Sequence, residues 1–275
     1  MLKVGFQGLR GAYSEMAVKK YFGDKAEPLG FNEFEDVFTA LDKGRLDYGV
    51  LPLENTIAGT VTENYDMLLR YDVSMTGEVY VKIEHCLLGV KGAQLGDITA
   101  AYSHPHALKQ CRRFCKENNI TPVPKFDTAG SSAWVAEQGD WHNAGIASSL
   151  CAEIYNMDIL AGNIQANDLN TTRFAVVRQG VMYPLTADYR TKTSLAFKAK
   201  HEPGELLKCL EIFAGHNLNL TKLESRPIPE IPWEYIFYTD FEADGDTAKG
   251  STRDAILKLQ EQVLMVKLLG TYAKA

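Results

Sequence analysis

The chain has 275 residues, 45% of them hydrophobic and 23% charged, which is typical of a soluble globular protein with one large domain or two modest ones. Its formal net charge of -6 argues against a surface for nucleic acid or anionic membrane, so any anionic ligand must be held by local groups. The N-terminal MLKVGFQG lacks the features of a secretion signal, and no apolar run approaches the ~20 residues of a membrane helix, so we expect a cytoplasmic protein.

The 5 cysteines form no CxxC pair, which favours reduced thiols over a disulfide scaffold. Several cysteines and histidines lie on or near one predicted helix, at His85, Cys86, His104, His106, Cys111 and Cys115. Their intervals match no common zinc pattern. We therefore favour small, partly buried thiols over a metal site, and we expect no metal and no organic cofactor.

The first 90 residues alternate strand and helix patterns. Strands are predicted at 2–7, 48–53 and 74–90, and helices at 14–22, 34–44 and 62–71. This alternation is typical of a parallel sheet with helices on both faces.

The same alternation starts again after residue 90. Strands are predicted at 98–103, 121–126 and 143–148, and helices at 106–118, 129–138 and 150–156. Two α/β lobes in succession predict a cleft between them, and such clefts often enclose small ligands.

Residues 179–192, with Gly180 and Pro184, lack periodicity and are predicted to form a linker. The elements expected beyond it are strand 193–199, helix 203–216, strands 218–228 and 233–243, helix 251–262 and strand 263–272. This β-α-β-β-α-β order is that of the ferredoxin-like unit. Pro203 is expected in the first turn of its helix.

The opening GFQGLRGAYS contains three closely spaced glycines. Gly5, Gly8 and Gly11 follow a GxxGxxG spacing, which does not specify the GxGxxG turn of dinucleotide-binding proteins. We favour a loop of close backbone approach, followed by a helix that starts near Ser14 and presents N–H groups to an anion such as a carboxylate.

Polar residues recur where predicted strands end, and DLNTTRFAVV places further polar residues at a strand start. They are Glu54, Asn55 and Thr56, with Thr60 nearby, then Ser103 and Gln110, then Asp127 and Thr128, and finally Thr172 and Arg173. Each alone can be a turn or a helix cap. Their clustering favours a site for a small, anionic, oxygen-rich molecule. The sequence has no GxSxG, HExxH or Walker motif to support covalent catalysis or metal hydrolysis.

The segments GFQGLRGAYS, LPLENT, SHPHALKQC, NTTRF, PGELL and NLTKLESRP resemble prephenate dehydratase followed by an ACT regulatory domain. The resemblance implies a catalytic domain at 1–180 with two lobes like those of periplasmic binding proteins, approximately 1–85 with a return segment 163–180, and 86–162. It implies a ferredoxin-like ACT domain at 191–275. No mutase-like segment precedes residue 1, so we expect a monofunctional chain.

The family's reaction converts prephenate to phenylpyruvate, water and carbon dioxide. By resemblance the catalytic residues are Thr172, Glu54, Asn55 and Gln110, and the substrate-binding residues are Ser103, Arg173, Phe174, Asp127, Thr128, Ser14 and Thr60. Thr172 would donate a hydrogen bond or a proton to the departing hydroxyl. On a strand Arg173 points away from Thr172 and Phe174, so it either reaches a substrate carboxylate from irregular backbone, which we favour slightly, or braces the strand.

The ACT domain of the family pairs with its twin and binds phenylalanine as a feedback inhibitor, which implies a homodimer or homotetramer. The residues expected at that site are Pro203, Gly204, Glu205, Leu206, Leu218, Asn219, Leu220, Glu224, Ser225 and Arg226. Glu205 departs from the family pattern and adds a charge there, so dimerisation alone is an alternative role for the domain. Arogenate dehydratase and a non-catalytic aromatic-acid or amino-acid sensor remain alternatives, although a sensor has no chemical reason to keep Thr172-Arg173-Phe174.

Overall fold

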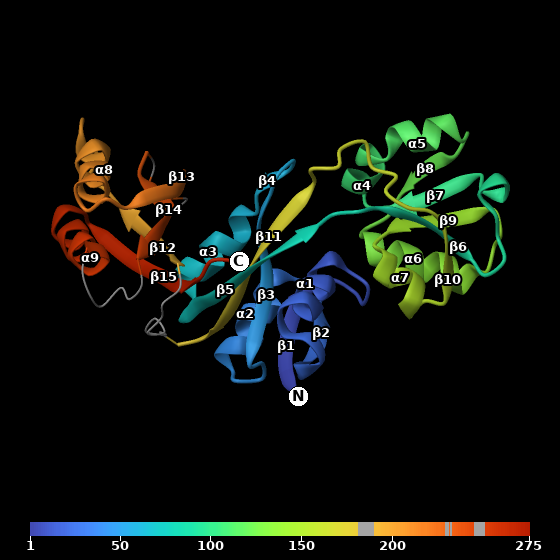
Figure 1. Cartoon of the computed structure of the whole chain (residues 1–275), viewed down its shortest axis with the longest axis horizontal. Helices are drawn as coiled ribbons and strands as arrows, with labels where there is room; N and C mark the ends of the chain where they lie inside the picture. Colours follow the sequence, from blue (N-terminus) through green and yellow to red (C-terminus); the bar gives the residue numbers. More distant parts are fainter. Residues whose placement is uncertain (181–189, 229–230, 232, 245–250) are drawn as a thin grey trace. The chain divides into compact units, whose positions relative to one another are not determined.

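A computed structural model describes residues 1–180, 190–228, 231, 233–244 and 251–275 (Figure 1). The chain divides into two compact units. Unit 1 comprises Met1–Ala40, Val50–Val61 and Val79–Phe174, and unit 2 comprises Leu41–Gly49, Thr62–Glu78 and Ala175–Ala275. No helix among the described residues is long and apolar enough to cross a membrane.

The first sheet has the strand order β2-β1-β3-β11-β5, with the short β4 paired to β3. Its strands are β1 (Leu2–Gln7), β2 (Ala26–Phe31), β3 (Tyr48–Asn55), β4 (Gly59–Thr60), β5 (Val73–Lys82) and β11 (Thr171–Gln179), and its helices are α1 (Tyr13–Phe22), α2 (Phe34–Asp42) and α3 (Thr62–Arg70). The sequence did not predict β2, because Pro28 and Gly30 interrupt its apolar pattern. Its place at the sheet edge explains why they are tolerated there.

The second sheet has the order β10-β6-β9-β7-β8. Its strands are β6 (Cys86–Val90), β7 (Ala100–Ser103), β8 (Thr121–Pro124), β9 (Asn143–Ala147) and β10 (Met157–Ala161), and its helices are α4 (Pro105–Gln110), α5 (Arg112–Glu117), α6 (Thr128–Gln138) and α7 (Ser149–Ile154). Strand β7 runs parallel to β8 and β9, whereas β6 runs antiparallel to β9 and β10, so this sheet is mixed. Short 3₁₀ turns lie at Gly23–Lys25 and Leu95–Asp97.

Two predicted elements are each divided in the structure. The strand expected at 74–90 becomes β5 and β6, because the backbone between them bonds elsewhere. The Ile83 N–H donates to the Asn170 carbonyl at 2.8 Å, and the His85 N–H donates to the Gln165 side chain at 2.8 Å. The helix expected at 106–118 becomes α4 and α5, and the Gln110 carbonyl accepts from the Ala166 N–H at 3.0 Å.

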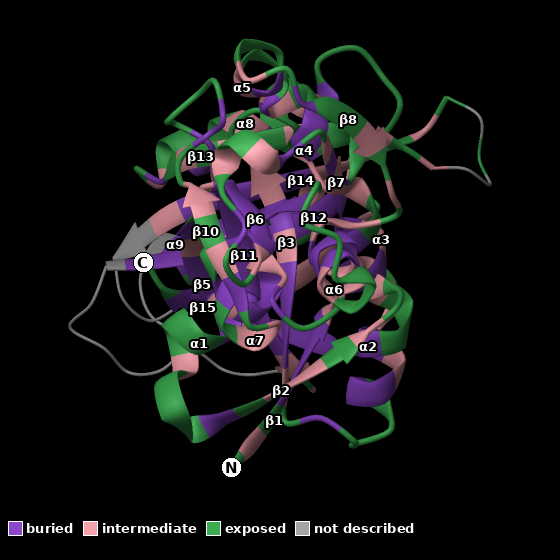
Figure 2. Cartoon of the chain, turned by 90° about the vertical axis from the view of Figure 1, so that its right-hand side faces the viewer, coloured by how far each residue is buried: buried purple, intermediate pink, exposed green. Residues whose placement is uncertain are grey.

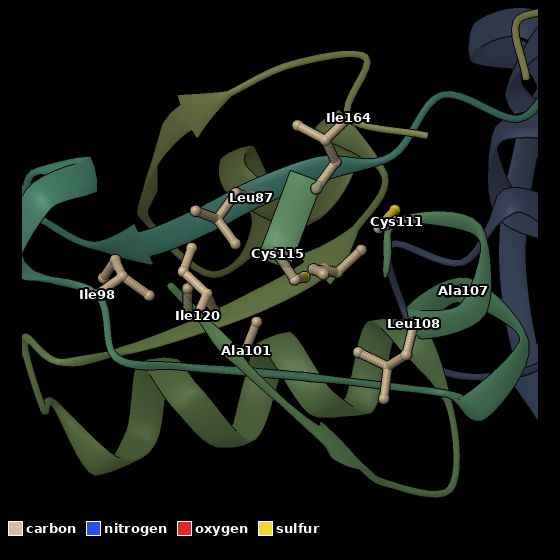
Figure 3. Packing of buried hydrophobic residues seen from close by; sticks show 11 residues of the cluster. Leu87, Ile98, Ala101, Ala107, Leu108, Cys111, Cys115, Ile120 and Ile164 are labelled. Atoms are coloured by element: carbon tan, nitrogen blue, oxygen red, sulfur yellow. The ribbon is translucent and has the colours of Figure 1, made fainter. Parts of the chain in front are cut away.

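The buried residues of the second sheet form a compact apolar cluster (Figure 3). Cys111 and Cys115 lie inside it among strand residues such as Leu87 and Ala101. Burial raises the pKa of the Cys111 thiol to about 12, so the group stays protonated and behaves as a small apolar side chain. Figure 2 shows central strands such as β5 and β6 largely buried, whereas β8 and much of the outer helix surface are exposed.

The C-terminal part of unit 2 has the predicted β-α-β-β-α-β order. Its elements are β12 (Arg190–Lys198), α8 (Glu205–Gly215), β13 (Asn219–Pro227), β14 (Tyr235–Asp244), α9 (Ser251–Gln262) and β15 (Met265–Ala273). The strand order is β13-β14-β12-β15, all antiparallel. Helices α8 and α9 contact each other and share one apolar core with the sheet (Figure 1).

Two expectations at the start of this region need correction. Most of the predicted linker, 181–189, lies outside the described residues, whereas 190–192 already belong to β12. Pro203 is not in the first turn of α8, because the N-cap is Gly204, with φ of 86°. Glycine suits that left-handed conformation, so the helix begins one residue after Gly204.

Residues 62–78 belong to the same unit as the C-terminal sheet, and polar contacts join the two. Lys267 Nζ donates to the carbonyls of Leu69 and Tyr71 at 2.9 and 2.7 Å. Two ion pairs add to this, Lys192 with Glu78 at 3.1 Å and Arg226 with Asp66. The C-terminal sheet is therefore attached to a segment that follows β4 in the sequence.

Candidate active site

Unit 1 contains a pocket of about 460 Å³, a volume suited to a small organic molecule. Its lining residues lie on strands of the first sheet, on the helices that accompany the two sheets, and on the loops between these elements. The lining residues are Gln7, Tyr13, Ser14, Pro52, Asn55, Ala58, Val61, Ile83, His85, His104, His106, Ala107, Gln110, Phe126, Asp127, Thr128, Asn170, Thr172 and Phe174.

Seven residues expected at the site lie on this pocket, namely Ser14, Asn55, Gln110, Asp127, Thr128, Thr172 and Phe174. The structure therefore brings these seven positions to one pocket, and their roles remain predictions. Glu54, Thr60, Ser103 and Arg173 do not line it.

The Asn55 side chain determines how the Thr172 hydroxyl is oriented. Asn55 Oδ1 accepts the backbone N–H groups of Ile57 and Ala58 at 2.9 and 2.8 Å, which fixes the amide orientation. Asn55 Nδ2 then donates to Thr172 Oγ1 at 2.9 Å. Because the Thr172 oxygen already accepts this bond, its own proton is free to be donated into the pocket.

The same amide network continues across the pocket. Asn55 Nδ2 also donates to Asn170 Oδ1 at 2.7 Å, and Asn170 Nδ2 donates to Gln110 Oε1 at 3.2 Å. His85 Nε2 lies 2.7 Å from the same Gln110 oxygen, and His85 Nδ1 lies 2.9 Å from the Tyr13 hydroxyl. Sequence reasoning assigned no role in the site to Asn170, His85 or Tyr13. Asn170 and Tyr13 lie in the segments NTTRF and GFQGLRGAYS that carry the resemblance, and His85 interrupts the apolar run 74–90.

Burial lowers the pKa of His85, although the hydrogen bond with Gln110 opposes the shift. Burial also lowers the pKa of His104, which lines the pocket. Among the described residues that line the pocket there is no Lys or Arg. The pocket is therefore rich in hydrogen-bond donors and poor in fixed positive charge.

Three expected site residues have structural contacts of their own. Ser103 is fully buried and donates to the Ile146 carbonyl at 2.6 Å, which links β7 to β9. Glu54 and Thr60 are register partners across the β3–β4 hairpin. Direct roles of these three residues in the reaction remain predictions. Their positions favour a role in supporting the wall of the pocket.

Asp127 combines a structural contact with a place on the pocket. It is the N-cap of α6, and its Oδ1 accepts the Gly130 N–H at 2.5 Å. Its carboxylate therefore keeps the first turn of α6, which begins at Thr128, in place beside the pocket.

Arg173 is buried and lies on β11 between two residues that line the pocket, Thr172 and Phe174. Side chains alternate along a strand, so the Arg173 side chain leaves on the other side. This placement favours the bracing role over the contact with a substrate carboxylate that we had slightly preferred.

The glycine loop before α1 lies against α7. A Cβ atom on Gly11 would lie 2.5 Å from Cys151 Sγ, and the Gly11 carbonyl accepts the Ser148 hydroxyl at 2.6 Å. The Gly11 N–H donates to Glu15 at 2.6 Å. The N-cap residue of α1, Ala12, offers no side-chain hydrogen bond, and Ser14 lies on the pocket.

A second pocket, of about 370 Å³, lies in unit 2 beside the start of α8. Among the residues expected to bind phenylalanine, only Pro203 and Leu206 line it. Leu218 is part of the apolar core, and Arg226 pairs with Asp66. The structure does not place Gly204, Glu205, Asn219, Leu220, Glu224 and Ser225 on this pocket.

The Glu205 carboxylate, which departs from the family pattern, is buried and paired. It accepts hydrogen bonds from Lys208 at 2.5 Å and from Gln262 at 2.8 Å. The bond with Lys208 lowers the pKa of Glu205. The charge is thus neutralised locally, which weakens the argument that it disturbs a nearby ligand site.

No group of three or more potential metal-ligating side chains occurs in the part of the chain that the structure describes.

A polar pocket at strand ends of an α/β unit is typical of enzymes that enclose small, oxygen-rich molecules. Residues 4–181 match the model of the prephenate dehydratase family. The chain belongs to the prephenate dehydratase family, as the resemblance predicted, and is a lyase.

Curated relatives extend this similarity over nearly the whole chain. An Arabidopsis thaliana arogenate dehydratase/prephenate dehydratase is 38% identical over 285 residues, covering 98% of this chain and 72% of the relative. A bifunctional chorismate mutase/prephenate dehydratase of Aquifex aeolicus is 36% identical over 275 residues, covering 100% and 74%.

Two solved structures share the fold of the full chain. One, titled as GqqA, a novel type of quorum quenching acylases, has a TM-score of 0.91, 31% identity and coverage of 99% and 98%. The other, prephenate dehydratase of Arthrobacter aurescens in complex with L-Phe, has a TM-score of 0.89, 27% identity and coverage of 100% and 90%.

Proposed function

We propose that the chain converts prephenate to phenylpyruvate in L-phenylalanine biosynthesis, and that Thr172 assists departure of the ring hydroxyl. The observation that carries this assignment is the bond from Asn55 to Thr172, which leaves the Thr172 proton for the substrate. The reaction is prephenate dianion plus one proton giving phenylpyruvate anion, carbon dioxide and water.

The electron flow explains why hydroxyls and amides suffice. The electrons of the bond between the ring and its carboxylate become part of the aromatic system as carbon dioxide leaves. The C4–O bond breaks with its electrons on oxygen, so that oxygen gains negative charge and must receive a proton. A donor aimed at this oxygen stabilises the transition state more than the ground state.

The scarcity of positive charge in the pocket fits the decarboxylation. A tight ion pair with the ring carboxylate would stabilise the group that must be lost, and so raise the barrier. The described lining residues include no Lys or Arg, and burial lowers the pKa of two lining histidines, His85 and His104. The side-chain carboxylate of the substrate would instead lie near the first turn of α1, at Ser14.

The decisive experiment incubates purified protein with prephenate and follows phenylpyruvate by its absorbance. Thr172→Ala should lower kcat by about 10²-fold or more and change KM by no more than a few-fold. Thr171→Ala is the matched control, because Thr171 is the adjacent threonine on β11 and does not line the pocket. A Thr172→Ala protein with near-normal kcat would contradict the assignment.

Two other activities are tested in parallel. Arogenate differs from prephenate by an amino group on the side chain, and the names of the relatives include both activities. Comparing kcat/KM for both substrates identifies the preferred one. An acylase activity is suggested by the GqqA likeness. Release of acid from an acyl amide, with no turnover of prephenate, would replace the dehydratase proposal.

We propose that the C-terminal β-α-β-β-α-β region is an ACT domain at 191–275. It follows, in the sequence, a catalytic domain at 1–180 whose two lobes resemble those of periplasmic binding proteins. Phenylalanine would bind where two ACT domains of a homodimer or homotetramer meet. The Arthrobacter complex with L-Phe and the pocket at Pro203 and Leu206 support this.

Calorimetry with phenylalanine up to millimolar concentration tests the regulatory site. Coupling between two sites is reciprocal in binding free energy. Bound phenylalanine should therefore change the affinity for a non-reacting prephenate analogue, and the bound analogue should change the affinity for phenylalanine by the same factor. Absence of phenylalanine binding would leave dimerisation as the role of the C-terminal region.

A further inference from the structure

His85 is a buried histidine that the reaction scheme above does not use. It lies between β5 and β6, is only 3% exposed, and both of its ring nitrogens have polar neighbours. Its backbone N–H is also held, by Gln165 at 2.8 Å. A histidine held at both ring nitrogens and at its backbone N–H has a defined position next to the Gln110 amide.

The hydrogen-bond network determines which His85 nitrogen carries a proton. Asn55 is fixed by two backbone N–H groups, so its Nδ2 faces Asn170 Oδ1, and Asn170 Nδ2 must then face Gln110 Oε1. An amide oxygen is only an acceptor. His85 Nε2, 2.7 Å from that oxygen, therefore carries a proton and donates it.

The opposite side of the ring has a polar partner. The Tyr13 hydroxyl donates to the Glu84 carbonyl at 2.8 Å and lies 2.9 Å from His85 Nδ1. In the neutral ring with a proton on Nε2, Nδ1 is an acceptor and shares the single Tyr13 proton with the Glu84 carbonyl. Tyr13 thus holds the ring in place and is compatible with the tautomer that Gln110 requires.

We propose that His85, held by Tyr13, is a positioning residue of the active site, which keeps the Gln110 amide in the orientation that Asn170, Asn55 and Thr172 need. Without the Nε2–H donor, the Gln110 amide keeps two longer contacts, from Asn170 Nδ2 to its Oε1 at 3.2 Å and between its Nε2 and His106 Nδ1 at 3.3 Å, and it can rotate more easily. A rotated Gln110 turns its Nε2 toward Asn170 Nδ2, which places two donors face to face. The proposal rests on the dehydratase function proposed above.

Protonation of His85 distinguishes this role from that of a general base. The ionisable groups that interact with the ring are Tyr13 and His106, and those that interact with Tyr13 are Cys86, Cys111, Cys151 and Glu84. A protonated ring keeps its Nε2–H and therefore keeps its bond to Gln110. Positioning therefore persists when His85 ionises, whereas a base would lose activity.

Nitrogen NMR tests the geometry without any mutation. The chain has 6 histidines, and loss of one signal set in His85→Gln identifies the His85 resonances. At neutral pH we expect the neutral Nε2–H tautomer with Nδ1 as acceptor. A dominant Nδ1–H tautomer would overturn the proposal even if the enzyme is fully active.

Kinetics test the consequence for catalysis. His85→Leu should lower kcat by about 10- to 100-fold with a smaller change in KM, and His85→Gln, which keeps an N–H donor, should recover much of this loss. His142→Gln is the control, because His142 is exposed and does not line the pocket. Thermal unfolding of each variant verifies that it is folded.

Two outcomes contradict the proposal in kinetics. Equal loss in folded His85→Leu and His85→Gln would show that the N–H donor is not what matters. Loss of an ionisation from the pH profile of kcat in His85→Gln would show that His85 transfers a proton. If the wild-type protein does not turn over prephenate, the proposed function fails, while the tautomer prediction can still hold.

Discussion

The orientation of single side-chain amides is the main feature of the pocket at the residue scale. Asn55 joins two backbone N–H groups to the Thr172 hydroxyl, so one side chain sets the direction of a donor in the pocket. The sequence predicted Asn55 and Thr172 as site residues. It did not predict that one acts on the other, because that relation depends on a contact between residues 117 positions apart.

Asn55→Asp should test this relation with almost no change in shape. The aspartate can still accept the N–H groups of Ile57 and Ala58, but it cannot donate to Thr172. The Thr172 proton would then be drawn to the carboxylate, and kcat should fall by about 10²- to 10³-fold, as for loss of a preorganised donor. Steady-state kinetics measure this, with thermal unfolding as a check on folding. A kcat within three-fold of wild type would contradict it.

The lowered pKa of His85 predicts a pH dependence of stability. Its folded pKa lies below the unfolded value of about 6.5, so between these values the unfolded chain binds more protons. The free energy of unfolding should therefore fall as pH drops below about 6.5, and this contribution is fully present above it. Urea unfolding between pH 5 and 7 measures the slope. His85→Gln should reduce it, and an unchanged slope would assign the effect to other groups.

At the element scale, most helices and strands follow from local patterns, and the exceptions share a cause. The break between β5 and β6 and the break between α4 and α5 both occur where backbone groups bond to the segment 164–170 or to residues beside it. Periodicity describes one element at a time, so it cannot reveal a backbone group captured by a distant loop. Strand β2 was missed for another reason, since its edge position permits a proline.

The C-terminal end of α3 provides a prediction at this scale. Lys267→Met removes two hydrogen bonds to the carbonyls of Leu69, in the last turn of the helix, and Tyr71, just after it, and should reduce the free energy of unfolding by about 1–2 kcal/mol. Lys274→Met is the comparison, because the Lys274 pair with Glu242 is more exposed and should contribute less than about 1 kcal/mol. Urea unfolding of both variants measures the difference, and equal effects would contradict it.

At the scale of the whole molecule, the boundary between the two units does not follow the end of the family match at residue 181. Residues 62–78 precede much of unit 1 in the sequence, yet they belong with the C-terminal sheet. The sequence predicted two consecutive domains, because patterns along a chain cannot show that an early segment is part of a later unit.

A chain that ends at residue 180 tests this organisation. It lacks Lys192 and Lys267, so the Glu78 carboxylate loses its ion pair with Lys192, and the carbonyls of Leu69 and Tyr71 at the end of α3 lose the bonds from Lys267. We expect a melting temperature lower by more than about 5 °C, because several polar contacts and an apolar surface are lost together. If it stays folded, it should keep some dehydratase activity and lose any response to phenylalanine. A melting temperature equal to that of the full chain would contradict the shared unit.

The assignment of residues 62–78 to unit 2 also matters for building hybrid enzymes. A C-terminal region transferred from a relative would meet α3 and the first half of β5 of the recipient, and it would need the partners of Lys192, Arg226 and Lys267 there. The transferable part is therefore discontinuous in the gene. A graft that includes the donor's equivalent of residues 62–78 should yield more soluble protein than one joined at a single crossover.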